Sequence, residues 1–188
     1  ALNHPNWKMG KKISTDSATM INKVYEVIEA KKLFNIDYKK IKILIHPKSY
    51  IHAIIKFNNG LTNIIAHDTT MKVPIFNTLF LESNHKLKTK DLNIDILNNL
   101  KLDRVSSARF PMIKLLKFLP DNHSLFETVI VSANDKLVEL FLENKIKFTD
   151  IQKKLFEIVN KKEFQKFKKK VPKNINDITN LNNYVRLK

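Results

Sequence analysis

Glycine is nearly absent from this chain, which has two, Gly10 and Gly60, among 188 residues. A dinucleotide-binding turn needs several glycines close together, because its backbone must bend tightly against a pyrophosphate. The sequence therefore excludes such a turn. Gly60 ends the tripeptide Asn58-Asn59-Gly60, which favours a tight hairpin turn because Asn and Gly tolerate positive φ. We expect strands over residues 50–57 and 61–66 on either side of this turn.

The first hundred residues mix helix and strand, whereas the remainder is mainly helical. A loosely apolar stripe predicts a helix over 18–34, preceded by the cap candidates Ser14-Thr15-Asp16-Ser17. A short apolar run at 41–45 predicts a third strand beside the hairpin. Residues 83–108 are expected to be irregular. The other predicted helices cover 75–82, 111–119, 125–144, 148–167 and 175–187.

These elements predict the fold class α+β, in which a central mixed sheet with flanking helices is followed by a mainly helical C-terminal domain. We expect an α+β domain over residues 1–108. A helical region over 109–188 should end in the C-terminal domain. Thr149 is the expected cap of the helix at 148–167.

The chain is strongly basic, with 34 Lys and Arg against 18 Asp and Glu and a net charge of +16. Such a charge raises nucleic-acid binding as a possible function. However, arginine occurs only at Arg104, Arg109 and Arg186, whereas base recognition favours arginine. The abundant lysine accompanies abundant Asn and Ile, as in a broad compositional bias. We therefore expect no nucleic-acid partner.

Two further features of the composition exclude classes of protein. Cysteine is absent, so the chain has no disulfide framework and no thiolate metal site. No apolar run reaches the roughly 18 residues that a membrane span requires. We expect no membrane association, and a cytoplasmic location or, in a eukaryote, a plastid-type stroma.

Four polar side chains near the start of the first predicted helix could form an anion site. Asn22 and Glu26 are spaced i, i+4 and Lys23 and Glu26 are spaced i, i+3, so they share a helix face. Ser17 would lie at the helix N-terminus, where free N–H groups favour an anion. Alternatively, Lys23 and Glu26 form an ordinary surface pair and Ser17 only caps the helix. Spacing alone favours this second interpretation.

Other candidates lie on predicted loops and strand ends. His4, Trp7 and Met9 lie on a loop that could close over a reaction site, or that could tuck its aromatic side chain under the domain. His46 and His52 flank the turn at Pro47-Lys48-Ser49. They either point to the same pocket as Glu26 or are hydrogen-bonded at strand ends.

One long, ordered motif resembles a known family. The run from His4 to Lys23, HPNWKMGKKISTDSATMINK, closely resembles the lid and phosphate-binding run of the 1-deoxy-D-xylulose 5-phosphate reductoisomerase family. Glu26 follows where that family has its third metal-binding carboxylate. The resemblance covers nearly the whole chain. It continues at Ile45-His46-Pro47, Ile51-His52, Met71, Pro74-Ile75, Phe110-Pro111, Ser132-Ala133-Asn134 and Phe148-Thr149-Asp150-Ile151.

The resemblance implies an NADPH-dependent oxidoreductase that rearranges and reduces 1-deoxy-D-xylulose 5-phosphate to 2-C-methyl-D-erythritol 4-phosphate, in non-mevalonate isoprenoid biosynthesis. It also implies a divalent cation, Mg or Mn, and a homodimer formed through a central catalytic domain, here residues 1–108. By similarity, the phosphorylated sugar would be bound by residues of the lid and the first helix, with Glu26, His4 and Trp7 as the catalytic set. The implied substrate contacts are His4, Trp7, Met9, Ser17, Asn22, Lys23 and Glu26, with Glu26 as metal ligand and Gly10 and Met71 as NADPH contacts.

The chain departs from the family pattern in ways that matter for activity. No Asp-x-Glu element, which supplies the family's other two metal carboxylates, occurs in the sequence. Val24 replaces a usual glycine, and the segment before Met71 lacks the usual Pro-Asp. We therefore expect a fragment that begins within the lid and that by itself lacks NADPH binding and most activity. The alternative is a shortened, non-catalytic relative that dimerises.

Overall fold

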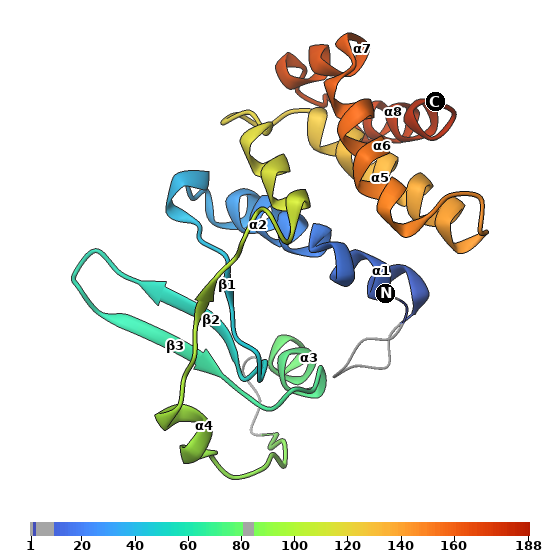
Figure 1. Cartoon of the computed structure of the whole chain (residues 1–188). Helices are drawn as coiled ribbons and strands as arrows, with labels where there is room; N and C mark the ends of the chain where they lie inside the picture. The colour runs from blue at the N-terminus through green and yellow to red at the C-terminus, as the bar shows by residue number, and fades with distance from the viewer. Residues whose placement is uncertain (1, 3–9, 81–84) are drawn as a thin grey trace. The chain divides into compact units, whose positions relative to one another are not determined.

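The computed structural model describes residue 2 and residues 10–80 and 85–188, which form two compact units (Figure 1). One unit comprises residues 1–43 and 106–188, and the other comprises residues 44–105. The predicted lid residues His4, Trp7 and Met9 lie outside the described residues. Over the described ranges, the structure contains no helix long and apolar enough to cross a bilayer.

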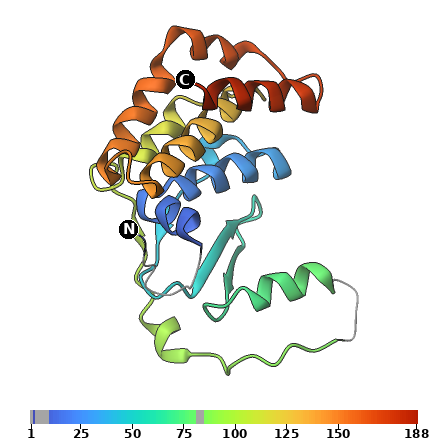
Figure 2. The same ribbon diagram turned by 90° about the vertical axis from the view of Figure 1, so that its right-hand side faces the viewer.

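The first unit is helical and is built around α5 (Phe126–Leu142), an amphipathic helix that packs against α6 (Phe148–Asn160) and α8 (Ile175–Arg186). On its other side α5 packs against α1 (Lys11–Thr19), as Figure 2 shows. The core contains buried aliphatic and aromatic side chains from α5, α6 and α8, whereas the buried residues of α1 are polar. Its largest members include Phe126, Ile130, Ile151, Leu155 and Phe164.

The predicted helix at 18–34 is two helices in the structure, and this corrects the sequence-based interpretation. Met20 adopts the left-handed conformation (φ 64°) between α1 and α2 (Ile21–Phe34). The expected caps Ser14, Thr15 and Asp16 instead lie buried within α1. The apolar stripe does not reveal this break, because Ile21 and Val24 stay in the core on the far side of it.

The second unit contains the predicted hairpin. Strands β2 (Ile51–Lys56) and β3 (Thr62–Ala66) pair antiparallel, and Gly60 has a φ of 91° in the turn between them. The turn is closed by a hydrogen bond from Gly60 N–H to the Phe57 carbonyl (3.1 Å). The prediction of this hairpin is confirmed.

The expected sheet of three or more strands is not present in the described part of the chain. β1 (Leu44–Ile45) pairs with β4 (Asp103–Arg104), and this pair is separate from the hairpin. The segment at 83–108, which was expected to be irregular, contributes β4 and the short helix α4 (Ile94–Asn98). The structure is thus mostly helical with small antiparallel sheets. β1 is too short to extend a sheet, and its partner is distant in the sequence.

The remaining elements agree with the predicted positions more closely than with the predicted types. Pro111 begins the 3-10 helix η2 (Pro111–Lys117), α8 matches the last predicted helix, and α3 (Lys72–Leu79) begins before Pro74. The helix expected at 148–167 ends earlier, as α6, and is followed by α7 (Lys162–Gln165) and η3 (Lys166–Lys169). Thr149 is not its cap. Instead Asp150 accepts a hydrogen bond from Lys147 N–H (2.9 Å). The 3-10 helix η1 (Tyr38–Lys40) follows α2.

Candidate functional site

The junction between α1 and α2 brings together most of the predicted phosphate-binding residues that the structure describes. Ser17 lies in the last turn of α1, whereas Asn22 and Lys23 lie in the first turn of α2. Ser17 therefore does not lie at a helix N-terminus, which is where the sequence predicted it. The junction itself is compact, since Met20 N–H donates to the Ser17 carbonyl (3.1 Å) and Lys23 N–H to the Met20 carbonyl (3.2 Å).

Asn22 carries a signal of an incomplete polar environment. Its Oδ1 atom is buried and has no hydrogen-bond partner among the described residues. Buried amide groups are nearly always paired, so an unpaired one at the N-terminal turn of a helix needs an explanation. A ligand hydroxyl or another donor at the junction would supply the missing partner of this acceptor oxygen, and the dipole at the N-terminus of α2 would favour an anionic group nearby.

Lys23 and Glu26 form the surface pair that their spacing allows. Lys23 Nζ lies 2.8 Å from Glu26 Oε2 and 3.0 Å from Oε1. Both side chains are well exposed, at 41% and 52%, and such an i, i+3 pair contributes only about 0.2–0.5 kcal/mol. A phosphate oxygen or a divalent cation can therefore replace either partner at little cost.

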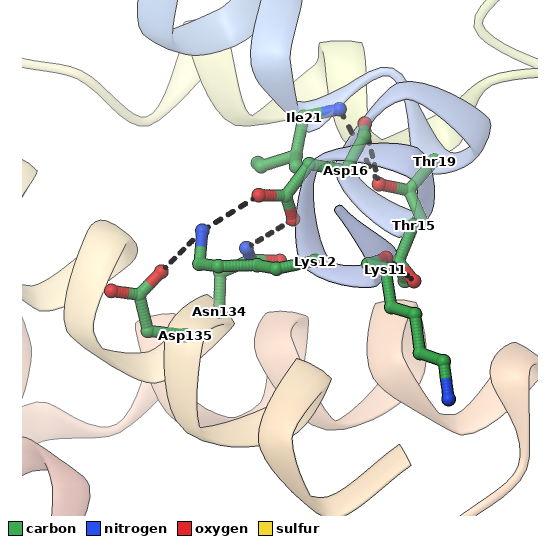
Figure 3. Close-up of polar contacts among 8 residues, drawn as sticks. All are labelled: Lys11, Lys12, Thr15, Asp16, Thr19, Ile21, Asn134 and Asp135. Carbon is green, nitrogen blue, oxygen red and sulfur yellow. Dashed lines mark hydrogen bonds and ion pairs between the residues drawn. The ribbon is translucent and has the colours of Figure 1, made fainter. Parts of the chain in front are cut away.

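A partly buried ionic cluster around Asp16, beside the junction, was not identified in the sequence. Asn134 Nδ2 of α5 donates to Asp16 Oδ1 (2.9 Å), and Lys12 Nζ lies 2.8 Å from Asp16 Oδ2 and 3.0 Å from Asp135 Oδ1 (Figure 3). Burial, together with the nearby carboxylates of Asp16 and Asp135, raises the pKa of Tyr25 well above its usual range. The persistence of Ser132-Ala133-Asn134 in the motif was the one available signal.

Comparisons with known proteins agree with the motif. A family model described as the DXP reductoisomerase C-terminal domain matches residues 68–188, well over half of the chain. A second model, described as the 1-deoxy-D-xylulose 5-phosphate reductoisomerase C-terminal domain, matches residues 1–34. The chain belongs to the DXP reductoisomerase family.

The relatives and solved structures carry the same name. A 1-deoxy-D-xylulose 5-phosphate reductoisomerase from Pelagibacter ubique is 61% identical over the whole chain, and one from Sulfurihydrogenibium is 39% identical over 88% of it. The chain spans about half the length of these relatives, 48% and 44% respectively.

The structural likeness also extends over nearly all of the chain. A reductoisomerase solved with NADPH, fosmidomycin and magnesium has a TM-score of 0.86 and 31% identity. The match covers 100% of this chain and 47% of the chain of that structure. The Zymomonas mobilis enzyme solved with NADPH has a TM-score of 0.78 and 30% identity, and the match covers 94% of this chain and 45% of its own.

Among the described residues, Glu26 is the carboxylate that the resemblance assigns to the metal of a reductoisomerase. A carboxylate such as that of Glu26 suits a hard divalent cation, which prefers oxygen ligands. However, the described residues contain no group of three or more His, Asp or Glu side chains that could hold a metal. Glu26 therefore fits as one ligand and not as a complete site.

The remaining predicted residues of the reductoisomerase site belong to different parts of the chain. Gly10 immediately precedes α1, and Met71 immediately precedes α3 in the other unit, where it is exposed. His46 Nδ1 lies 3.1 Å from the Lys101 carbonyl and His52 Nε2 lies 3.2 Å from the His67 carbonyl. Both histidines therefore have hydrogen bonds within their own unit. The NADPH contacts and the shared pocket with Glu26 stay predictions.

Proposed function

We propose that this chain forms the catalytic and C-terminal helical part of an NADPH-dependent reductoisomerase. The enzyme would convert 1-deoxy-D-xylulose 5-phosphate to 2-C-methyl-D-erythritol 4-phosphate in isoprenoid biosynthesis. The observation that carries this proposal is the family membership of a chain whose ordered run from Ser17 to Glu26 lies at one helix junction. Relatives that match the whole chain or most of it bear this enzyme's name.

The α1–α2 junction would bind the substrate phosphate. Phosphate oxygens accept hydrogen bonds from neutral and charged donors. Such donors would be the Ser17 hydroxyl, the Asn22 amide and the Lys23 ammonium. The N-terminus of α2 adds a favourable dipole. In this arrangement Lys23 would leave Glu26 and pair with the phosphate.

Glu26 would contribute one of the ligands of a Mg or Mn ion, which when bound supplies a Lewis acid for the substrate oxygens. The other ligands would come from outside the described residues. Gly10 and Met71 would contact NADPH, the hydride donor. His4 and Trp7 would act with Glu26 in the catalytic set, and Met9 would help the lid to exclude water from the substrate.

The β2–β3 hairpin supports the proposal of a homodimer. Five of its exposed apolar side chains are 38–49% exposed, and this amount of exposed apolar surface favours a protein partner. We propose a second copy of the chain as that partner. We also propose that the two small sheets are parts of the central mixed sheet of the catalytic domain. The exposed side chains are Ile54, Ile55, Phe57, Ile64 and Ile65.

Two further proposals concern the domain boundary and the location of the enzyme. The boundary near residue 108 would separate the catalytic domain from the helical region along the sequence, while residues 1–43 of the catalytic domain pack in one unit with residues 106–188. The enzyme would act in the cytoplasm or in a plastid-type stroma. Neither nucleic acid nor a membrane is a proposed partner.

A chimaeric enzyme tests the activity. These 188 residues would replace the matching segment of the Pelagibacter ubique relative, with which they share 61% identity, and this protein is called the chimaera below. We expect NADPH oxidation that depends on 1-deoxy-D-xylulose 5-phosphate and on a divalent cation. A folded, dimeric chimaera without turnover would contradict the proposal and favour the non-catalytic alternative.

Two variants of the chimaera test the assigned residues. Glu26→Gln should lower kcat by about a hundredfold and raise the Mg concentration needed for half-maximal activity, because one of the metal ligands loses its charge. Lys23→Ala should mainly raise KM for the substrate, since it removes a phosphate contact. Lys153→Ala on the exposed side of α6 is a control for the loss of a lysine. Unchanged kinetics in both site variants would show that the assignment is wrong.

A further inference from the structure

The α1–α2 junction is attached to the helical region by a buried hydrogen bond between residues far apart in the sequence. Asp16 and Asn134 are separated by 118 residues, and the bond from Asn134 Nδ2 to Asp16 Oδ1 is 2.9 Å long (Figure 3). Asn134 is fully buried and the Asp16 side chain is 6% exposed. Water cannot readily replace either partner, so the geometry of this contact is tightly specified.

The charge of Asp16 is balanced locally by Lys12. The Lys12 ammonium lies between Asp16 and Asp135, at 2.8 Å and 3.0 Å. Burial alone would lower the pKa of Lys12, but its bonds to the two carboxylates outweigh burial and raise it. The cluster therefore joins α1 to two consecutive residues of α5, with one ammonium shared by two carboxylates.

A second set of hydrogen bonds connects Asp16 to the start of α2. Thr19 Oγ1 donates to the Asp16 carbonyl (3.1 Å) and accepts from Ile21 N–H (3.4 Å), as Figure 3 shows. Ile21 is fully buried and is followed by Asn22 and Lys23. A continuous series of polar contacts thus runs from α5 through Asp16 and Thr19 to α2, the helix that carries Asn22 and Lys23.

We propose that Asp16 and Asn134 are positioning residues, through which the helical region holds Ser17, Asn22 and Lys23 in register to receive a phosphate. This inference rests on the function proposed above. Ser17 and Lys23 lie on different helices, so they can contact one phosphate only if the junction between those helices is held. A displacement of about 1 Å in such a site can cost as much as a hundredfold in rate.

Substitutions at Asn134 in the chimaera test this role. Asn134→Asp places a second carboxylate against Asp16, and two like charges at this distance repel. We expect KM for the substrate and the inhibition constant of inorganic phosphate both to rise by about tenfold, with kcat changed by less than about threefold. Asn160→Asp, at an exposed position at the end of α6, adds the same charge and should leave all three unchanged.

An exchange of the two residues provides the decisive comparison. The double variant Asp16→Asn with Asn134→Asp restores one amide donor and one carboxylate acceptor, so it should recover most of the lost phosphate affinity. Such rescue measures the coupling of the two side chains directly. Asp16→Asn alone, which keeps the side-chain volume, should raise both constants by a smaller factor and serves if Asn134→Asp does not fold.

The outcomes separate this inference from the proposed function. An unmodified chimaera without activity would overturn the proposed function. If the unmodified chimaera is active, a single variant that folds and unfolds as the parent does, with unchanged KM and unchanged phosphate inhibition, would overturn the positioning role. A double variant that remains as impaired as Asn134→Asp would also overturn it.

Discussion

Asp16 shows how far the environment of one residue can depart from its local appearance. It lies in a run of Ser, Thr and Asp, which are the residue types that commonly cap helices. In the structure it lies within α1 with its side chain buried, and Lys12 and Asn134 offset the cost of burying its charge. The neighbouring sequence contains no information about Asn134, so this pairing could not have been predicted from composition or spacing.

The core of the helical unit makes a residue-scale prediction. Leu155 is fully buried in α6, and Leu155→Ala should lower the free energy of unfolding by about 2–5 kcal/mol through lost burial and the cavity left behind. Leu187→Ala is the matched control, since Leu187 is 85% exposed, and it should change stability by less than about 0.5 kcal/mol. Chemical denaturation of both variants gives these values, and equal losses would contradict the assigned core.

Tyr38 predicts a dependence of stability on alkaline pH. Burial, with Glu127 and Asp121 nearby, raises its pKa to about 12, compared with about 10 in an unfolded chain. The folded protein keeps the phenolic proton longer, so this contribution is fully present below about pH 10 and is lost between about pH 10 and 12. Tyr38→Phe should therefore flatten the fall in unfolding midpoint across that window. An unchanged slope in thermal scans would contradict this expectation.

At the scale of elements, the hairpin was predicted correctly because its turn is specified by local residues. The predicted three-stranded sheet was wrong because strand pairing outside the hairpin is non-local. The turn at Asn58-Asn59-Gly60 specifies its own geometry, because its residues tolerate the required dihedral angles. The pairing of β1 with β4 joins segments about sixty residues apart and depends on the chain between them. Local apolar periodicity likewise predicted α5 and α8 well, whereas it did not reveal the break at Met20.

The two glycines of the chain provide a matched pair for testing the hairpin. Gly60 has a φ of 91°, so Gly60→Ala should destabilise the hairpin by about 1–2 kcal/mol. Gly10 has a φ of −59°, and Gly10→Ala should have little effect. An added Cβ meets no atom within 4 Å at either position, so backbone strain alone distinguishes them. Hydrogen exchange of the β2 and β3 amides should speed up only in the Gly60 variant.

At the scale of the whole molecule, the helical unit is assembled from both ends of the chain. Residues 1–43 and 106–188 share one core, in which Ile21, Val24 and Ile28 of α2 join side chains from α5 to α8. Two of the three proposed phosphate ligands, Asn22 and Lys23, therefore lie on a helix that the C-terminal region stabilises. This arrangement explains why a site encoded near the start of the chain depends on residues near its end.

Removal of α8 tests this dependence. Leu181 and Val185 are buried against the core, and burial of two such side chains contributes about 3–6 kcal/mol. That is a large share of a typical domain's stability of about 5–15 kcal/mol. A chain ending at Pro172 should therefore lose cooperative unfolding and bind a hydrophobic dye. Arg186→Met removes only the half-buried ion pair with Glu139 and should unfold cooperatively. A cooperative truncated chain would contradict the proposed role of α8.

The sequence by itself determined the hairpin, the main C-terminal helices, the exclusion of a dinucleotide-binding turn and, through one long motif, the family. Each of these follows from residues that are close together in the chain, whose preferred dihedral angles and apolar periodicity act locally. Only the tertiary structure decided the break at Met20, the pairing of β1 with β4 and the bond between Asp16 and Asn134. These features depend on contacts between distant segments, whose energies exceed local preferences but leave no local pattern.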